Sequence, residues 1–488
     1  MKNGEGLHMT DISRREALKL GGFTFAGLAS LSLLGCAPGP SASSSASAAA
    51  SSAASSASSA AAHEGGIIAR DAFVGLDDLV ELADGTKVVA INFDNGATTP
   101  SLVKGLEAIQ EQLPMYGSIG RGKGQKQSHS TEVFNSVRSK MLDFVNAPED
   151  EYTAVWCGTA TDALNKIAGA LATDSSDVIL TTRMEHHAND LPWRARAKVV
   201  YADVDEKGRL KIEDIEKLLA ENTVKVVSVQ AASNVTGYVN DVHRIAKMAH
   251  DAGAIMVADG AQIAAHRAFS MKGESDAEDI DFFVCSAHKM YAPFGSGAIV
   301  AKTALLNEFL PAYRGGGMVD VVADSDVTWL EAPDRWEAGS PNYFGVVALG
   351  ASLDTFNEVG FDAIEEHEQR LLRKAIDGLL ALPRVKVFGD TEDISDKVGV
   401  ITFNVEGIDA ADVAQHLADE HGVAVRQGEF CAHPYCHRLL GVPDEVIATN
   451  MKNHDFVAPA MVRISFGLYN DETEVDAFLD AMAKIATS

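Results

Sequence analysis

Polar and ionisable side chains follow four short apolar runs in the middle of the chain. Residues 177–182 are followed by Glu185, His186 and His187, and residues 225–230 by Asn234. Residues 255–258 are followed by Asp259 and Gln262, and residues 282–285 by Ser286, His288 and Lys289. Helical patterns separate the runs, which predicts parallel strands whose carboxyl ends meet at one edge of a sheet. Because ligands of such sheets bind at that edge, these side chains predict a single site there.

Lys289 has the most specific chemistry of these residues. A lysine at a strand end that is desolvated enough to be neutral can form a Schiff base with an aldehyde cofactor. Pyridoxal phosphate needs three further groups: an anion near its ring nitrogen, donors around its phosphate and a ring stacked on its face. Asp259 could be the anion, Ser286 and His288 the phosphate donors, and His186 the stacking ring.

Residues 157–165 form a small-residue turn that opens a predicted helix. Its free backbone N–H groups, together with Thr161, would make a phosphate cradle. Taken singly, each feature also has a purely structural explanation: Lys289 as solvated surface, Asp259 as a turn residue, the 158–165 segment as an ordinary helix N-cap, and the histidine pair as mutually satisfied. Their joint order and spacing favour the cofactor site.

The elements that would position these residues alternate along the chain. Strand-like runs lie at 177–182, 197–204, 225–230, 255–258, 282–285 and 297–302, with a predicted helix at 242–252. Predicted helices at 346–358 and 362–382 precede strands at 399–405 and 423–426. The pattern predicts an α/β domain with a mostly parallel sheet over residues 114–344 and a smaller α+β domain over residues 345–488. We expect the segment 66–113 to pack with the smaller domain.

Composition excludes several classes of protein. The chain has 488 residues, with 69 acidic and 41 basic side chains and a net charge of −28. This balance argues against duplex nucleic acid as a partner and against attachment to anionic lipid through a basic patch. The five cysteines are too few for a disulfide scaffold.

The first 65 residues predict an export signal followed by a flexible linker. A twin-arginine pattern (Arg14, Arg15) precedes an uncharged stretch over 20–34, which is short for a membrane span and suits an export signal. The stretch ends in Leu-Leu-Gly-Cys36, which resembles a bacterial lipobox in which Cys36 is acylated. Residues 41–62 are only serine and alanine. We therefore expect a signal over 1–35, a linker over 36–65, and a lipid-anchored domain on the extracytoplasmic side of the membrane.

Six ordered motifs resemble one family. They are EHHAN with a following LPW at 185–193, SNVTG at 233–237, DGAQ at 259–262, SAHKMYAP at 286–293, RWEAGSPN at 335–342 and RQGEFCA at 426–432. They resemble the class V aminotransferase family of fold type I pyridoxal-phosphate enzymes, and most closely its cysteine desulfurase and selenocysteine lyase branch. The resemblance spans about residues 92–479. It implies a large domain with a seven-stranded sheet, a smaller C-terminal domain and a homodimer.

The resemblance implies a role for each cofactor-binding residue. Lys289 would hold pyridoxal phosphate and later move the α-proton of the substrate. Asp259 would pair with the ring nitrogen, and Gln262 would bond the ring hydroxyl oxygen. The other implied contacts are ring stacking by His186 and phosphate binding by Thr161, Ser286, His288 and, from the second subunit, Ser340.

The resemblance also implies how an amino-acid substrate is bound and attacked. Asn234 and Arg463 would bind its carboxylate, for which a guanidinium fork is suited. Cys431 would attack the substrate's sulfur as a thiolate, leaving a persulfide on the enzyme and releasing alanine. Two residues depart from the branch's pattern, because Glu429 and Phe430 stand where it has two histidines. An acidic neighbour would raise the pKa of a thiol, so this departure leaves the identity of the substrate open.

The segment from Cys431 to His437 has alternative interpretations. It holds four potential metal ligands in seven residues, but ligands this close, with a proline among them, fit a tetrahedral zinc site poorly. We therefore predict no metal. A disulfide between Cys431 and Cys436 would remove the nucleophile in an oxidising compartment.

Three functions remain open from the sequence. The first is a cysteine-desulfurase-like lyase that uses Cys431. The second is another reaction on the same scaffold, such as transamination, epimerisation or a different elimination, because fold and cofactor do not fix the reaction. The third is a cofactor-free solute-binding lipoprotein, against which Lys289 and Asp259 argue.

Overall fold

The computed structural model describes residues 65–120, 122–452 and 459–487. The twin-arginine pattern, Cys36 and the serine- and alanine-only segment lie outside these residues. Within the described part of the chain, no helix has both the length and the apolar character needed to cross a membrane.

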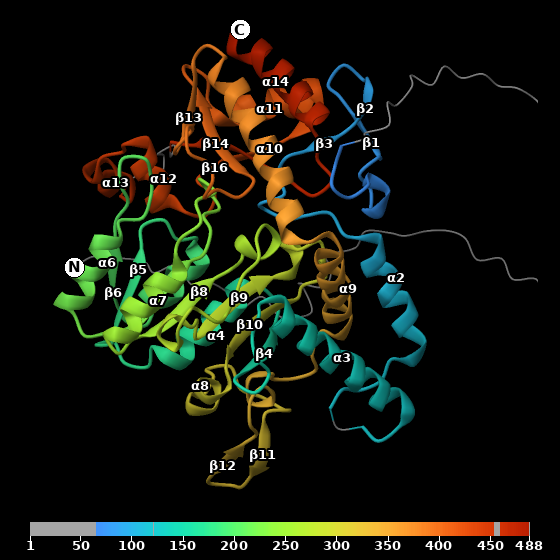
Figure 1. Cartoon of the computed structure of the whole chain (residues 1–488), viewed down its shortest axis with the longest axis vertical. Helices are drawn as coiled ribbons and strands as arrows, with labels where there is room; N and C mark the ends of the chain where they lie inside the picture. The colour runs from blue at the N-terminus through green and yellow to red at the C-terminus, as the bar shows by residue number, and fades with distance from the viewer. Residues whose placement is uncertain (1–64, 121, 453–458, 488) are drawn as a thin grey trace, which may run out of the picture. The chain divides into compact units, whose positions relative to one another are not determined.

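A seven-stranded sheet forms the centre of the described chain (Figure 1). Its strands, in spatial order, are β4 (Tyr152–Cys157), β10 (Gly297–Lys302), β9 (Phe282–Ser286), β8 (Ile255–Asp259), β7 (Val224–Gln230), β5 (Val178–Thr182) and β6 (Lys198–Ala202). The five strands β5 to β9 run parallel, and β10 runs antiparallel to both of its neighbours. The predicted α/β fold with a mostly parallel sheet is confirmed, and the predicted strands are found within one or two residues of their expected ends.

Both faces of this central sheet are buried, because alternate residues along a strand point to opposite sides. On β9, Phe283 joins the core on one face, whereas Phe282 and Val284 join the core on the other. The first core includes helices α3 (Gln125–Phe144), α6 (Ile212–Glu221), α7 (Val242–Asp251) and α9 (Tyr343–Val359). The second includes α4 (Ala160–Leu171), α5 (Leu191–Arg194) and α8 (Thr303–Glu308). Coverage of both faces is typical of sheets with parallel strands.

A smaller antiparallel sheet forms the C-terminal unit, which we define as residues 361–487. Its strands, in spatial order, are β13 (Val385–Phe388), β14 (Val400–Val405), β17 (Met461–Ser465) and β16 (Arg426–Gly428). Helices α10 (Phe361–Leu380), α11 (Ala410–His421) and α14 (Glu472–Thr487) share its apolar core. Two short helices, α12 (His433–Leu440) and α13 (Asp444–Asn450), follow β16.

The segment that precedes α3 contacts the C-terminal unit at several points. Its strand β3 (Ile91–Asn92) pairs in parallel with β15 (Val423–Ala424). Arg70 forms a buried ion pair with Glu474 at 2.6 Å. The segment also contains a hairpin of β1 (Leu79–Glu81) and β2 (Lys87–Val89), and helix α2 (Val103–Gln112), which packs against α9.

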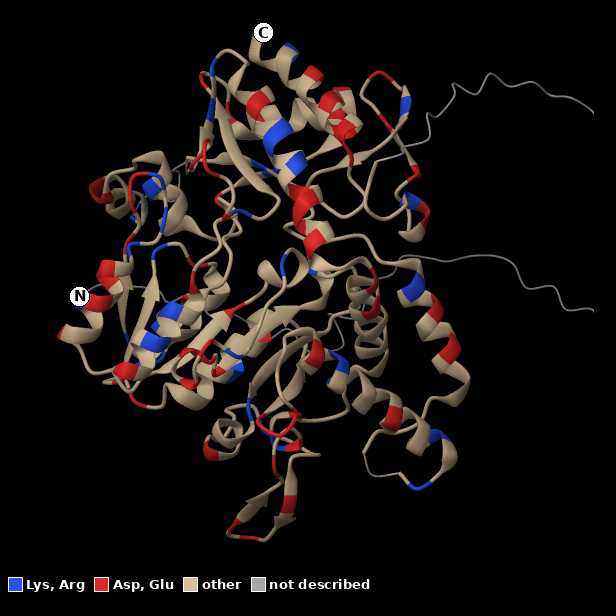
Figure 2. Cartoon of the chain, in the orientation of Figure 1, with Lys and Arg blue, Asp and Glu red and all other residues tan. Residues whose placement is uncertain are grey.

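Neither the β1–β2 hairpin nor a second hairpin farther along the chain has a counterpart among the sequence-based predictions. Strands β11 (Val319–Val322) and β12 (Val327–Trp329) project from the body of the chain below α8 in the view of Figure 1. Along the ribbon of Figure 2, acidic and basic residues are interspersed, and α10 carries both.

Candidate active site

One cavity of about 240 Å³ collects most of the residues predicted for the site. Its walls include Thr161, His186, Asn234, Asp259, Ser286, His288, Lys289, Cys431 and Arg463. These side chains come from the carboxyl ends of the central strands and from the C-terminal unit, so the predicted sheet edge is where they meet. Gln262 lies just behind the wall, where its Nε2 donates to the backbone oxygen of Gly96 at 2.9 Å.

Lys289 ends a short 3₁₀ turn, Ala287–Lys289, that directly follows β9. Burial inside the cavity lowers the pKa of Lys289 to about 8, although the nearby Asp259 carboxylate opposes this change. A large fraction of the amine is therefore neutral near pH 8. A neutral lysine amine is the form that can attack an aldehyde.

Asp259 is the last residue of β8 and is 3% exposed. Its carboxylate accepts a hydrogen bond from the backbone N–H of Ala261 at 3.0 Å. Burial raises the pKa of Asp259, and the positive charge on Lys289 acts in the opposite direction. A further cation against this carboxylate would stabilise its charged form.

His186 presents a neutral imidazole to the cavity. Its Nδ1 accepts a hydrogen bond from the backbone N–H of Ala188 at 3.0 Å, which assigns the ring proton to Nε2. Burial, followed by the charge on Lys289, lowers the pKa of His186 to about 3. A neutral ring can lie on a cofactor face without adding a charge, and its Nε2–H remains available as a donor.

The turn that carries His186 is fixed by the residues around it. Glu185 accepts hydrogen bonds from the Thr182 hydroxyl at 2.6 Å and from the Asn189 side chain at 2.7 Å. Trp193 donates its Nε1–H to Asn189 at 3.3 Å. Burial raises the pKa of Glu185 to about 8. The polar residues of the EHHAN segment, apart from the histidines, thus hold the turn in place.

The amino end of α4 opens onto the cavity. The Thr159 hydroxyl caps the helix by accepting from the N–H of Asp162 at 3.1 Å, and the Ser286 hydroxyl accepts from the N–H of Ala160 at 2.7 Å. Thr161 lies at the cavity wall beside them. A helix start with hydroxyl groups around it is a favourable place for a phosphate, as the small-residue turn predicted.

Arg463 reaches the cavity from β17 and is 2% exposed. Its guanidinium donates to the backbone oxygen of Asn234 at 2.9 Å and forms an ion pair with Asp94 at 3.1 Å. Its Nε has no hydrogen-bond partner among the described residues, and the same is true of Asn234 Oδ1 and Gln262 Oε1. Buried polar atoms are rarely left unpaired, so these three mark places where a ligand would bind.

Sequence reasoning did not assign Asp94 or Arg426 to the site. Asp94 sits between two arginines, 3.1 Å from Arg463 and 3.8 Å from Arg426. It follows the two-residue strand β3, which is too short to show a periodic pattern. The cluster of asparagine, aspartate and glycine at 92–96 gives a turn signal in the sequence, but no signal that the turn faces Arg463.

Cys431 is the exposed cysteine of the described chain. It lies between β16 and α12, and it and Phe430 have left-handed backbones with φ of 54° and 49°. Two hydrogen bonds hold this strained turn, from the His187 N–H to the Cys431 oxygen at 2.7 Å and from the Asn234 side chain to the Phe430 oxygen at 2.7 Å. Such strain at a cavity wall is typical of functional positions.

The remaining described cysteines are free and buried. Burial raises the pKa of Cys157 and of Cys285 to about 12, and it raises the pKa of Cys436 as well. Cys436 is completely buried and donates to the backbone oxygen of Glu429 at 3.3 Å. The structure therefore shows no bond between Cys431 and Cys436.

Glu429 directs its carboxylate to His437 at 2.6 Å and His433 at 3.6 Å.

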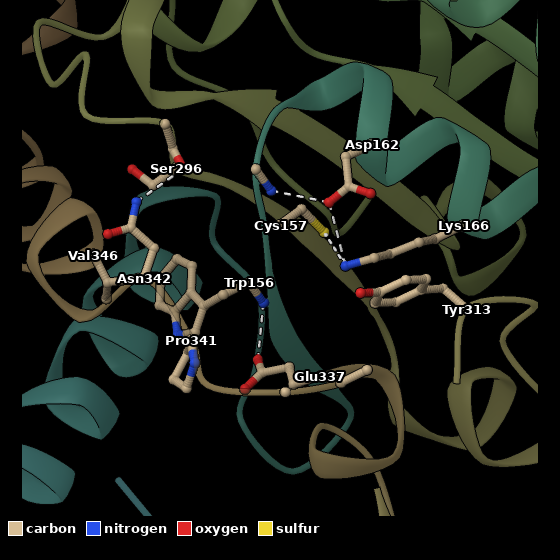
Figure 3. A pocket seen from close by; sticks show the side chains of 14 residues that line it. Trp156, Cys157, Asp162, Lys166, Ser296, Tyr313, Glu337, Pro341, Asn342 and Val346 are labelled. Carbon is tan, nitrogen blue, oxygen red and sulfur yellow. Dashed lines mark hydrogen bonds and ion pairs between the residues drawn. The ribbon is translucent and has the colours of Figure 1, made fainter. Parts of the chain in front are cut away.

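A second cavity, of about 280 Å³, lies beside the α4 end and is lined by Cys157, Lys166 and Glu337 (Figure 3). Lys166 Nζ is 3.7 Å from the Cys157 sulfur and 3.3 Å from Asp162. Ser340 belongs to a neighbouring surface cavity and not to the cavity that holds Lys289. Within one chain, the structure does not bring Ser340 together with the other predicted phosphate ligands.

Comparison with known proteins identifies the fold and family. The model of the class-V aminotransferase family matches residues 91–478. The chain belongs to this family. Its relatives include a "Probable cysteine desulfurase" of Halalkalibacterium halodurans, 36% identical over 81% of this chain and 92% of the relative, and a "Cysteine desulfurase" of Haloferax volcanii, 32% identical over 80% of this chain and 88% of the relative.

Solved structures of similar proteins carry the same description. The apo cysteine desulfurase of Thermococcus onnurineus superposes with a TM-score of 0.73 at 30% identity, covering 82% of this chain and 95% of that one. The cysteine desulfurase CsdA of Escherichia coli gives 0.71 at 29% identity, covering 85% and 96%. The class-V aminotransferase family uses pyridoxal phosphate. The buried Asp259, the amine of Lys289, the α4 end and the unpartnered polar atoms fit this cofactor.

Proposed function

We propose that this class-V enzyme removes the sulfur of L-cysteine, giving L-alanine and a persulfide on Cys431. The observation that carries the proposal is the position of Cys431, which is exposed and lines the same cavity as Lys289. The other described cysteines are buried, with raised pKa values that keep them protonated. The similarity to proteins named cysteine desulfurase supports the same reaction.

Different residues of the cavity bind the substrate, bind the cofactor and transfer protons. Arg463 binds the substrate carboxylate, for which its Nε–H is free among the described residues, and the free Oδ1 of Asn234 accepts from a donor such as the substrate's amino group. Asp259 would hold the ring nitrogen of pyridoxal phosphate, and Thr161, Ser286 and His288 would hold its phosphate. When bound, pyridoxal phosphate withdraws electrons from the carbon atoms of the substrate. Lys289 Nζ moves the α-proton, and the neutral His186 donates from Nε2.

The sulfur transfer balances without an outside oxidant. The thiolate of Cys431 attacks the sulfur of cysteine, so that an S–S bond forms while the bond from sulfur to Cβ breaks. The electron pair of the broken bond stays with the carbon skeleton, which takes up a proton and leaves as alanine. The outer sulfur remains on Cys431 as a persulfide.

Replacing the nucleophile tests this proposal. We expect Cys431→Ala to retain bound cofactor and to lose alanine release from L-cysteine by on the order of 10³-fold or more. Cys157→Ala is the matched control, because Cys157 lines a different cavity, and it should keep its activity. The measurement is alanine released per bound cofactor in the presence of a reductant. Unchanged release from the Cys431 variant would exclude the proposed role and favour another class-V reaction.

We also propose that the enzyme is exported by the twin-arginine route and anchored through a lipid on Cys36. The ordered sequence signals over residues 13–62 support this location. Cys36→Ser should move the protein from the membrane fraction to the soluble extracytoplasmic fraction. Retention of that variant in the membrane fraction would contradict the anchor.

We further propose a homodimer in which Ser340 of one subunit reaches the phosphate site of the other. The support is that Ser340 belongs to the implied phosphate ligands but lies outside the cavity of its own chain. Sedimentation of the holoenzyme as a monomer would contradict this arrangement.

A further inference from the structure

A separate cavity of about 440 Å³ lies next to the active site and is lined by basic side chains. The six that matter are Arg183, Arg194, Arg438, His187, His433 and His437. The cavity shares no lining residue with the one that holds Lys289. Its size is within the range of pockets that hold small organic ligands. A basic pocket is unexpected in a chain whose net charge is −28.

The carboxylates around this basic pocket do not match all of its arginines. Asp190 pairs with Arg194 at 2.5 Å, and Asp203 pairs with Arg438 at 2.5 Å. Asp444 also lines the cavity.

Arg183 makes no ion pair with any described residue. Its guanidinium stacks on the ring of Tyr201, 3.8 Å from the centroid. Burial, followed by repulsion from Arg438, lowers the pKa of Arg183, while the Tyr201 hydroxyl and the Asp203 carboxylate, which is bound to Arg438, act in the opposite direction. A cation that is both partly desolvated and repelled by a second cation would be stabilised by an anion between them.

The three histidines of this cavity are held by contacts with one another and with Glu429. The rings of His187 and His433 meet edge to face with centroids 4.4 Å apart. Burial, followed by the proximity of His433, lowers the pKa of His187. Glu429, the residue that departs from the family pattern, holds His437 at 2.6 Å and His433 at 3.6 Å. The replacement of a loop histidine by glutamate thus organises two histidines of the basic pocket.

The loop that carries Cys431 forms a shared wall. Phe430 and Cys431 line the active-site cavity, whereas His433 and Pro434 line the basic pocket. The N–H of His187, which also lines the basic pocket, donates to the oxygen of Cys431 at 2.7 Å. Two residues of chain span at most about 7 Å, so His433 cannot lie farther than this from Cys431 along the backbone. This short loop therefore separates the basic pocket from the cavity that Cys431 lines.

We propose that the basic pocket binds the anionic group of a small thiol that accepts the sulfur from Cys431. This inference rests on the proposed desulfurase function. The acceptor thiolate attacks the outer sulfur of the persulfide, the S–S bond breaks with its electron pair remaining on Cys431, and the acceptor leaves as a persulfide. The step is redox-neutral and regenerates the Cys431 thiolate. The unpaired charge of Arg183 selects acceptors that carry a carboxylate or a similar anion.

A matched pair of thiols tests the inference on the holoenzyme. 3-Mercaptopropionate and 3-mercapto-1-propanol have the same chain length and differ in one negative charge. We expect steady-state alanine release to saturate at a KM at least about tenfold lower with the anionic thiol, which corresponds to one good charge-assisted contact. Arg183→Gln should remove this preference while leaving the first turnover, which needs no acceptor, unchanged. Equal KM values for the two thiols in the wild-type enzyme would overturn the inference.

A control variant and a binding measurement separate this inference from the proposed function. Arg244→Gln alters an exposed arginine that pairs with Glu216 at 3.8 Å, and it should keep the preference for the anionic thiol. In calorimetry, 3-mercaptopropionate should bind the wild-type holoenzyme and lose at least about tenfold in affinity in Arg183→Gln. Inorganic phosphate should compete with it. If no alanine is formed, the desulfurase function fails, and this binding result still decides whether the pocket takes an anionic thiol. Phosphate binding without thiol binding would overturn the acceptor role.

Discussion

At the scale of single residues, burial and the charges of neighbouring groups together determine the protonation states of the reacting groups. Lys289 is drawn toward the neutral form by burial and toward the charged form by Asp259. His186 has no carboxylate against it, so burial and the charge on Lys289 act together to keep its ring neutral. Near pH 8 the site therefore offers a substantial fraction of neutral amine beside an uncharged imidazole.

The pH dependence of cofactor uptake tests the state of Lys289. The neutral amine attacks the aldehyde, so the rate of uptake by the apoprotein should rise with pH, with a midpoint near the pKa of about 8. Asp259 raises that pKa, so Asp259→Asn should move the midpoint to lower pH. Asp94 acts in the same direction more weakly, so Asp94→Asn should move it less. Absorbance changes after rapid mixing give the rates. A midpoint near pH 10 would show that Lys289 is solvated.

Sequence reasoning found the residues that follow long, buried strands and missed those that depend on distant contacts. Lys289 and His186 follow strands of the central sheet and Asp259 ends one, where the edge rule applies. Asp94 reaches the site only because its segment pairs with β15 and faces Arg463, more than 300 residues away in the chain. No local pattern encodes such a contact. The histidine contacts of Glu429 were missed for a similar reason, because they depend on the fold of α12.

At the scale of elements, the start of α4 combines two tasks that different threonines perform. Both threonines line the cavity, but the Thr159 hydroxyl caps the helix through the N–H of Asp162, whereas Thr161 makes no such cap. The cap stabilises the fold whether or not the cofactor is present. The Thr161 side chain matters only when a phosphate lies against the helix end.

Two alanine variants separate these tasks. Thr159→Ala should lower the free energy of unfolding by about 1 kcal/mol in the apoprotein and the holoprotein alike, because a side-chain cap is lost. Thr161→Ala should leave the apoprotein within about 0.5 kcal/mol of the wild type and reduce the extra stability that the cofactor confers. Urea unfolding with and without pyridoxal phosphate measures both. A Thr161 variant with an undiminished cofactor effect would place the phosphate elsewhere.

The elements themselves were predictable in proportion to how strongly they are buried. The parallel strands of the central sheet are continuous apolar runs, and the sequence marks them clearly. Strands β3 and β15 have two residues each, and the hairpin β11–β12 exposes Val321 and Val322, so neither carries a hydrophobic pattern.

Gly237 shows a further kind of constraint. It has φ of 78°, and a Cβ there would lie 2.7 Å from the oxygen of Val398 in the C-terminal unit.

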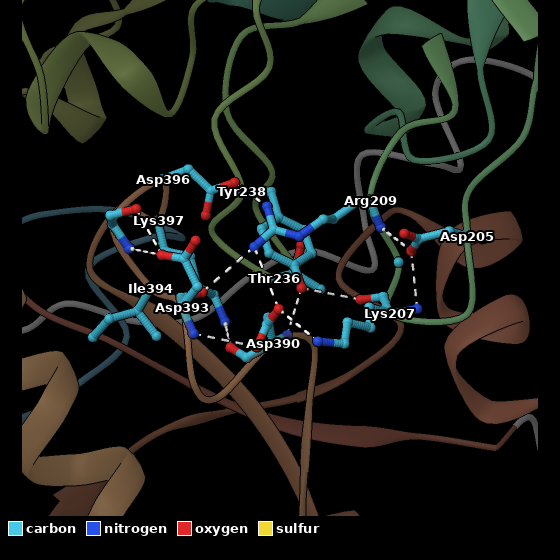
Figure 4. Close-up of polar contacts among 12 residues, drawn as sticks. Asp205, Lys207, Arg209, Thr236, Tyr238, Asp390, Asp393, Ile394, Asp396 and Lys397 are labelled. Atoms are coloured by element: carbon cyan, nitrogen blue, oxygen red, sulfur yellow. Dashed lines mark hydrogen bonds and ion pairs between the residues drawn. The ribbon is translucent and has the colours of Figure 1, made fainter. Parts of the chain in front are cut away.

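At the scale of the whole described chain, the active site depends on the C-terminal unit staying against the central sheet. Arg463 and Cys431 come from the C-terminal unit, whereas Lys289 and Asp259 come from the central sheet. A polar cluster around Tyr238 joins the two (Figure 4). Arg209 pairs there with Asp396, and Lys207 pairs with Asp390 at 2.8 Å.

Tyr238 is the buried centre of this cluster. Its hydroxyl accepts from the N–H of Asp390 at 2.5 Å and donates to the oxygen of Lys207 at 3.1 Å. The guanidinium of Arg209 lies 4.4 Å from its ring centroid, and the amine of Lys397 lies 5.1 Å from it. Burial lowers the pKa of Lys397 to about 8. Removing the hydroxyl would leave a buried backbone donor unpaired, which costs more than the bond itself contributes.

Two tyrosine-to-phenylalanine variants measure how much the Tyr238 cluster contributes to the contact between the C-terminal unit and the central sheet. Tyr238→Phe should lower the free energy of unfolding by about 1–3 kcal/mol, because the Asp390 N–H loses its partner. It should also raise the KM for the amino acid more than it lowers kcat. The reason is that Asn234 lies four residues from Tyr238 and must contact Arg463, which belongs to the C-terminal unit. Tyr152→Phe is the control, because the buried Tyr152 hydroxyl has no hydrogen-bond partner among the described residues, and its removal should leave stability equal or higher. Equal losses in both variants would show that the cost comes from repacking a buried ring and not from the contact between the two units.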